Sequence, residues 1–280
     1  MIRIVTDSAA DFEPQELENL NITCIPLTVS FGEDIYQENI NLSKDLFYEL
    51  LTTSGQAPKT SQAAPHFLLD ILEEGKAAGD EVIYITLSSA LSGTWQTAMM
   101  AKEMAEYDGC SIVDSRSATG GQRLLVEYAA RLRDEGCSAA QIVSAVESLR
   151  ERVVLYACID TMEYLYRGGR ISQTAYKLGS MAQIKPIIHL TTAGSIEVPA
   201  KAMGMRKGMD ILRRHLTEQE PDPDFPLYVM YTGCCDNAQI LAIRLQAMGY
   251  DIPAQRIINV GAAIGSHIGP NGCGIVYISK

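Results

Sequence analysis

The stretch EVIYITLSSALSGTWQT, residues 81–97, decides how we interpret the rest of the chain. Its first part, Val82 to Ile85, is rich in β-branched and aromatic residues and predicts a strand. A hydroxyl-rich turn follows, and a helical pattern begins near Thr94. Such a turn places free N–H groups and hydroxyl donors together, which favours binding of an anion. The other interpretation is that these hydroxyls only cap the helix and shape the turn, the commonest use of Ser and Thr beside a helix start.

The same pattern occurs twice more in the first half. Ile2 to Val5 precedes Thr6-Asp7-Ser8, Ser111 to Val113 precedes Asp114-Ser115, and a helical pattern follows each. Strands that alternate with helices predict a parallel, doubly wound sheet with helices on both faces. Ligands of such sheets bind at the carboxyl ends of the strands. We therefore expect one edge to gather the hydroxyls of Thr6, Ser8, Ser88, Ser89, Ser92 and Ser115.

Other segments of the first half have weaker patterns. Residues 22–29 are β-rich but interrupted by Pro26, which predicts an edge or irregular strand. Residues 43–51 predict a helix with Ser43 as its N-cap. Thr60-Ser61-Gln62 is a second hydroxyl cluster that precedes a helical pattern.

A second unit is predicted to begin near Arg152. Thr-Thr-Ala-Gly, residues 191–194, separates two of its β-rich segments and indicates a hairpin, so we expect mixed strand pairing. We predict a loop over 265–272, strands over 153–159, 184–190, 195–200, 227–231, 256–260 and 274–278, and helices over 172–183, 205–218 and 238–248. The predicted fold class is α/β with two domains: a parallel doubly wound sheet in residues 1–152 and a mixed-sheet α/β domain in residues 153–280.

Composition excludes several classes of function. The chain has 280 residues, 47% hydrophobic and 20% charged, and a net charge of −11. It therefore has no overall basic charge to attract a nucleic acid or an anionic membrane. Its N-terminus lacks the apolar core of a signal peptide, and no apolar run approaches the roughly 20 residues that span a bilayer. We expect a cytoplasmic protein without an integral membrane segment.

Cysteines and short motifs give no sign of a metal or cofactor. The seven cysteines are scattered through apolar segments and are predicted to be reduced thiols. C-x-x-C and H-E-x-x-H are absent from the sequence, as are the nucleotide motifs G-x-G-x-x-G and G-x-x-x-x-G-K-[ST]. We therefore expect no metal ion and no bound cofactor, and a nucleotide-dependent enzyme is disfavoured.

Six motifs taken together resemble the DegV family across the whole chain. They are Thr6-Asp7-Ser8, Thr60-Ser61-Gln62, the 87–94 turn LSSALSGT, the 167–172 segment RGGRIS, Ile184-Lys185-Pro186 and the 265–270 segment GSHIGP. The resemblance implies a two-domain α/β protein that binds one long-chain fatty acid. It also implies that the carboxylate lies between the domains and that the acyl tail is buried in the second.

The resemblance also implies the ligand-binding residues. Thr60 matches the first residue of the family's Thr-Ser-Gln motif, Ser92 the serine of its Ser-Gly-Thr turn, and His267 the histidine of its Gly-x-His-x-Gly-Pro loop. Arg170 either contacts the ligand and its phosphate during transfer or pairs with a surface carboxylate. Side chains of the second half that line the tail pocket, or belong to ordinary core, are Met162, Leu165, Leu178, Met181 and Met203.

Two functions follow from these residues. As implied by the resemblance, the chain is a carrier without catalysis of its own, and it presents the fatty acid to a fatty acid kinase subunit that uses ATP to form an acyl phosphate. The alternative is a serine-dependent lipid ester or thioester hydrolase with Ser92 as nucleophile and His267 as base. The sequence has no G-x-S-x-G elbow, which disfavours the hydrolase.

Overall fold

The computed structural model describes residues 1–177 and 183–280, without the side chains of residues 175 and 177. A four-stranded parallel sheet in the order β2-β1-β6-β7 forms the core of the first half. Its strands are β1 (Ile2–Asp7), β2 (Ile22–Ile25), β6 (Glu81–Thr86) and β7 (Cys110–Asp114). The helices around it are α1 (Pro14–Asn19), α3 (Pro65–Ala78), α4 (Thr94–Ala105), α5 (Thr119–Asp134) and α6 (Ala139–Arg150).

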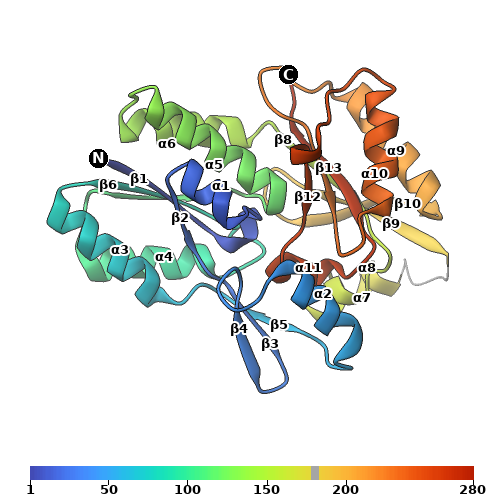
Figure 1. Cartoon of the computed structure of the whole chain (residues 1–280), viewed down its shortest axis with the longest axis horizontal. Coiled ribbons are helices and arrows are strands. Elements are labelled where there is room, and N and C mark those ends of the chain that lie inside the picture. The colour runs from blue at the N-terminus through green and yellow to red at the C-terminus, as the bar shows by residue number, and fades with distance from the viewer. Residues whose placement is uncertain (178–182) are drawn as a thin grey trace.

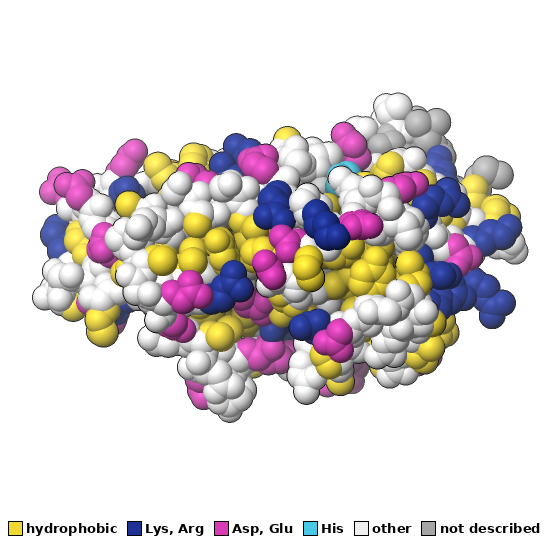
Figure 2. Space-filling model, turned by 90° about the horizontal axis from the view of Figure 1, so that it is seen from above, with side chains coloured by type: hydrophobic (Ala, Val, Ile, Leu, Met, Phe, Trp, Pro, Cys, Tyr) yellow, Lys and Arg dark blue, Asp and Glu magenta, His cyan; other side chains and the backbone are white. Residues whose placement is uncertain are grey.

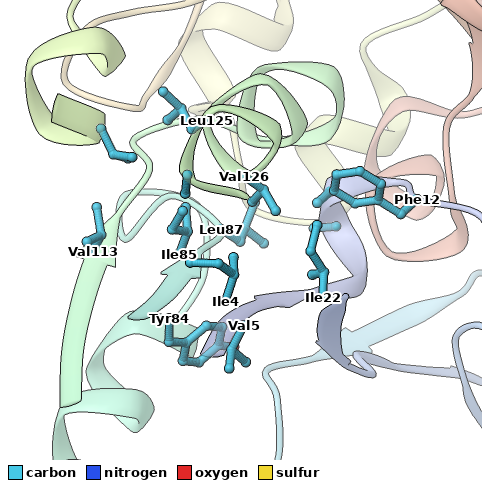
Figure 3. Packing of buried hydrophobic residues seen from close by; sticks show 14 of the residues in the cluster. Ile4, Val5, Phe12, Ile22, Tyr84, Ile85, Leu87, Val113, Leu125 and Val126 are labelled. Atoms are coloured by element: carbon cyan, nitrogen blue, oxygen red, sulfur yellow. The ribbon is translucent and has the colours of Figure 1, made fainter. Parts of the chain in front are cut away.

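Helices cover both faces of this sheet, as the sequence predicts. Figure 1 shows α5 and α6 on one side of the strands and α3 and α4 on the other. Figure 3 shows Ile4 and Ile85 beside Val126 of α5, while Tyr84 and Val5 lie on the opposite side of the strands. Burial of each such apolar side chain stabilises the fold by about 1.5–3 kcal/mol. The parallel doubly wound prediction is confirmed.

A small antiparallel sheet was not predicted. It consists of β3 (Thr28–Phe31), β4 (Asp34–Gln37) and β5 (Lys59–Ser61) in the order β4-β3-β5. The segment predicted over 22–29 as an edge or irregular strand is interrupted at Pro26: β2 is an edge strand of the parallel sheet, whereas β3 belongs to the small sheet, which the sequence did not predict. Proline has no N–H for a sheet ladder, so strand pairing ends there. The helix α2 (Lys44–Thr53) begins as predicted, with the Ser43 hydroxyl accepting the Leu46 N–H at 3.2 Å.

The second half contains a mixed sheet in the order β10-β9-β8-β13-β11-β12, in which only β11 and β12 are parallel neighbours. Mixed pairing and the β9–β10 hairpin are both confirmed. The strands are β8 (Val153–Cys158), β9 (Ile184–Leu190), β10 (Ile196–Met203), β11 (Tyr228–Tyr231), β12 (Ile257–Asn259) and β13 (Cys273–Ile278). The helices are α7 (Glu163–Arg167), α8 (Gln173–Lys177), α9 (Met205–Glu218), α10 (Asp236–Gln246) and α11 (Ala262–Ile268), and single 3₁₀ turns lie at Ser8–Ala10 and Ala254–Arg256.

Two elements of the second half differ from their predicted bounds. The loop predicted over 265–272 is wrong in its first part, because α11 extends to Ile268. Of the helix predicted over 172–183, α8 gives Gln173–Lys177; Gln183 lies in a turn, and residues 178–182 lie outside the described residues. Within the described ranges, no helix is both long enough and apolar enough to cross a membrane.

The two halves pack closely where α5 begins. A methyl group at Gly120 would lie 2.5 Å from Val276 of β13, so only glycine allows this approach. Buried residues on both sides of residue 152, including Leu125 and Val276, belong to one apolar cluster. The domain boundary at 152/153 stays a prediction.

Basic side chains are unevenly distributed despite the acidic composition. Figure 2 shows Lys and Arg side chains at the end of the molecule formed by the second half and across the middle of the same face, where hydrophobic side chains are also exposed, and few at the opposite end. The helices α9 and α10 contribute Arg206, Lys207, Arg213, Arg214 and Arg244.

Candidate functional site

A cavity of about 380 Å³ lies between the carboxyl edge of the parallel sheet and the mixed sheet. Its volume is within the range of small-molecule sites. The segments that follow β2, β6 and β7 supply Leu27, Leu87, Leu91, Ala118 and Thr119. The second half supplies mainly Leu155, Ala157, Ile159, Leu165, Ile188, Leu190, Ile196, Met230, Val260, Ala263, Ile264, Ile268 and Gly274. An apolar cavity between the halves suits an apolar ligand.

All four residues predicted to bind the ligand line this cavity. Thr60 lies on β5, Ser92 in the turn before α4, Arg170 after α7, and His267 on α11. Segments more than 200 residues apart in the chain thus meet at one place. Their role in binding remains a prediction.

Among these four residues, Thr60 of the first half of the chain is in contact with His267 of the second half. Thr60 Oγ1 and His267 Nε2 are 2.8 Å apart. Burial, together with the charge of Arg170, lowers the pKa of His267 to about 4, so the imidazole is neutral at physiological pH. Its Nδ1 has no hydrogen-bond partner among the described residues, and a methyl group at Gly168 would lie 2.0 Å from it. His267 is therefore a helix residue fixed on both sides, not a loop residue satisfied by backbone.

Ser92 is held by the start of α4. Its hydroxyl is 2.9 Å from the Thr94 hydroxyl and accepts the Thr94 N–H at 3.2 Å. Gln62, two residues after Thr60, donates to Thr97 of the same helix at 2.7 Å and packs against Gly93. Through Gln62, the Thr-Ser-Gln motif thereby holds β5 beside the turn that contains Ser92.

Arg170 brings the positive charge of the site. Its Nε donates to the Leu91 carbonyl at 2.9 Å and its Nη1 to the Gly168 carbonyl. No ion pair with a described carboxylate is found for it, so the alternative of a surface pair is not supported. Burial lowers its pKa, because the guanidinium loses hydration without gaining a counter-ion. The site therefore favours an anion.

Most of the strand-end hydroxyls do not contribute to the cavity. Thr6 donates to the Ile85 carbonyl, Ser8 to Glu38, Ser88 to the Gly194 carbonyl, Ser89 to Asp114 and Ser115 to the Ser117 carbonyl. Of the six, only Ser92 lines the cavity. The six hydroxyls do lie at the ends of parallel strands or in the turns after them, at one edge of the sheet, as predicted, but five of them bond to other protein groups and only Ser92 faces the cavity.

The apolar lining was largely missed by sequence reasoning. Of the five proposed lining residues, Leu165 lines the cavity, Met162 is buried core beside it, and Met203 is 58% exposed. Leu178 and Met181 lie outside the described residues. Small residues such as Ala157 and Gly274, which create the space, carry no signal that a sequence pattern could reveal.

The hydrolase alternative lacks its catalytic pair. The Ser92 hydroxyl is bonded to Thr94, whereas His267 Nε2 is bonded to Thr60, and the described contacts contain no hydrogen bond between Ser92 and His267. A nucleophilic serine needs a base within hydrogen-bond reach. The described contacts therefore give the hydrolase alternative no support.

Comparison with known proteins agrees with the resemblance. A family model for uncharacterised proteins of the DegV family matches residues 1–280. The chain is similar to a DegV domain-containing protein of Clostridium perfringens, 34% identical over 273 residues (95% of this chain and 93% of that protein). A second, of Caldanaerobacter subterraneus, is 32% identical over 282 residues (100% and 99%).

Solved structures give the same result. A DegV family protein from Thermus thermophilus, described as fatty-acid-binding, superposes with a TM-score of 0.89 at 27% identity and covers 100% of this chain and 99% of that one. DegV from Bacillus subtilis, described as a fatty acid binding protein, gives a TM-score of 0.84 at 29% identity, with coverage of 100% and 99%.

Proposed function

The chain belongs to the DegV family, and from this premise we propose that it binds one long-chain fatty acid, with the carboxylate between its two halves and the tail in the apolar cavity. The observation that carries the proposal is that Thr60, Ser92, Arg170 and His267 all line that cavity, with Thr60 bonded to His267 and Arg170 bonded to the Leu91 carbonyl beside Ser92. The two structures similar at 27% and 29% identity are both described as fatty-acid-binding.

Hydroxyl donors and one cation suit a carboxylate head. A carboxylate removed from water must be hydrogen-bonded, because an unpaired buried charge costs several kcal/mol. We assign the proton of neutral His267 to Nε2, from which it donates to Thr60 Oγ1 and leaves the Thr60 hydroxyl proton for the ligand. Ser92 supplies a second hydroxyl, and Arg170 supplies compensating charge. The proposed roles are thus direct binding by Thr60 and Ser92 and support by His267 and Arg170.

The tail supplies most of the binding free energy. At ~0.8 kcal/mol per buried methylene, a chain of about fifteen would gain on the order of 10 kcal/mol before entropy costs. Such a ligand binds tightly and leaves slowly. This suits a carrier without catalysis of its own better than an enzyme that must release a product in each turnover.

We expect the purified protein to contain a bound fatty acid. Native mass spectrometry should show one acyl chain per polypeptide, and delipidated protein should take up palmitate or oleate in one-to-one ratio. Bovine albumin, delipidated in the same way, controls for the extraction step. Protein that carries no lipid as isolated and takes up neither fatty acid would refute the proposed function.

We further propose, from the family resemblance, that the carrier works in the cytoplasm and presents the fatty acid to a separate kinase subunit. The bound carboxylate would attack the γ-phosphate of ATP, which breaks the bond to the β-phosphate and releases ADP, with the partner holding ATP and metal. Mixing the loaded protein with a fatty acid kinase subunit and ATP should yield acyl phosphate, trapped as the hydroxamate. The unloaded protein is the control, and equal product from both would contradict this step.

A further inference from the structure

The helix α11 begins against two buried carboxylates from distant parts of the chain. Asp11 Oδ1 accepts the Gly261 N–H at 2.9 Å, and Glu38 Oε1 accepts the Ala263 N–H at 3.2 Å. Asp11 is 1% exposed and Glu38 2%. The first N–H groups of a helix have no partner within it, so these carboxylates satisfy them and complement the helix dipole.

The second oxygen of each carboxylate also accepts a hydrogen bond. Thr119 donates its hydroxyl to Asp11 Oδ2, and Ser8 donates to Glu38 Oε2 at 2.7 Å. Thr119 lines the cavity and has a φ of +48°, a left-handed conformation that is costly for a β-branched residue. Asp11 therefore holds a strained wall residue as well as the helix.

Gly261 lets both carboxylates approach the same point. A methyl group there would lie 2.2 Å from Glu38 Oε1 and 2.8 Å from Asp11 Oδ1. The φ of Gly261 is −74°, which any residue can adopt, so the glycine is needed for the close approach alone. Both carboxylates are thus in close contact with Gly261, the N-cap residue of α11.

The charges around the pair only partly offset its burial. Lys44 of α2 donates to the Asp11 carbonyl at 3.1 Å and to Glu13 at 2.6 Å, and Arg123 of α5 is the other cation that acts on Asp11. Cys24 of β2 and Tyr48 of α2 are neutral neighbours whose own pKa values the pair raises in addition to the effect of burial. Burial raises the pKa of Asp11 to about 6. Burial and the charge of Asp11 raise the pKa of Glu38 to about 7.

We propose that Asp11 and Glu38 are positioning residues of the fatty-acid site: they fasten the first turn of α11 and so determine where His267 meets Thr60. The helix also lines the cavity with Ala263 and Ile264. Neither carboxylate lines the cavity, so both act through α11 and Thr119. The inference rests on the proposed function of the cavity.

The pair also makes stability depend on pH in a definite direction. Both carboxyl groups have folded-state pKa values above the ordinary ones of about 4. The folded state therefore binds their protons more tightly than the unfolded state does. Their contribution to stability is fully present below about pH 4 and is lost as pH rises through about 6 to 7. In the neutral isosteres Asp11→Asn and Glu38→Gln, the protein should therefore lose less stability as pH rises than the wild type does.

The test compares these isosteres with wild type and with Glu127→Gln. Glu127 is a largely buried carboxylate that contacts Arg123 and Tyr228 and does not line the cavity. We expect palmitate affinity at about pH 8 to fall about tenfold in Asp11→Asn and Glu38→Gln, because each loses a charged acceptor at α11. Their melting temperatures should fall less between about pH 5 and about pH 8 than that of wild type. Glu127→Gln should keep its affinity within about twofold.

A second readout separates this proposal from the function on which it rests. The imidazole ¹⁵N signals of His267 report its bond to Thr60 with or without ligand, and we expect them to shift in both isosteres and not in Glu127→Gln. Gly261→Ala keeps every ionisable group and should also shift the His267 signals. It replaces an isostere in this test if that isostere does not fold. Isosteres with wild-type affinity and unshifted His267 signals would overturn the proposal. Failure of wild type to bind palmitate would refute the function alone.

Discussion

Replacing Thr60 by valine and Ser92 by alanine together should lower palmitate affinity by a factor on the order of a hundred to ten thousand. Both hydroxyls line the cavity, as Arg170 and His267 do. Each hydrogen bond to a charged group is worth about 1.5–3 kcal/mol, and each 1.4 kcal/mol is about tenfold in affinity. Isothermal titration of delipidated protein with palmitate measures the loss directly.

Control variants separate loss of the ligand contacts from loss of structure. Thr53→Val with Ser89→Ala removes two hydroxyls that bond to Glu49 and Asp114 outside the cavity, and should bind as wild type does. Thr60→Ser keeps the hydroxyl and should restore most of the affinity. A double variant at Thr60 and Ser92 that melts like wild type and still binds palmitate equally well would show that the carboxylate lies elsewhere.

The sequence predicts those parts of the fold in which local pattern and tertiary environment agree. The run from Val82 to Ile85 is β-branched and aromatic, and the structure buries it on both faces of the parallel sheet. The motifs around Thr60 and Ser92 likewise contain their own turn and capping residues. For the turn at Ser92 the sequence carries enough information, because the contacts of Ser92 with Thr94 lie two residues along the chain.

Other parts depend on partners that no local pattern reveals. The strand β5 has three residues and pairs with β3, about thirty residues earlier, so its ladder is invisible in its own sequence. Glu38 and Asp11 look like ordinary loop carboxylates, and their partners on α11 are 225 and 250 residues away. Asp and Glu side chains are usually exposed, so the burial of these two could be found only in the structure. Such contradictions between local and global preference tend to lie near functional sites.

The cavity itself is another such feature, because small side chains create it. Along β8, Tyr156 and Cys158 pack into the core beneath α9 and α10, while Leu155, Ala157 and Ile159 point to the cavity, as strand alternation requires. Gly274 lies directly opposite Ala157 on β13. A larger residue at either position would occupy the space that we assign to the acyl tail.

Ala157→Phe should therefore abolish tight binding of long chains while affecting short ones less. A ring that displaces about four or five methylenes would remove about 3–4 kcal/mol of tail burial, or a factor on the order of a hundred to a thousand in palmitate affinity. Octanoate, which has half as many carbons, should lose less affinity in the variant than palmitate does. Ala77→Phe, on the exposed side of α3, is the matched control and should leave the affinity for both palmitate and octanoate unchanged. If Ala157→Phe keeps its melting temperature and still binds palmitate as wild type does, the tail does not occupy this cavity.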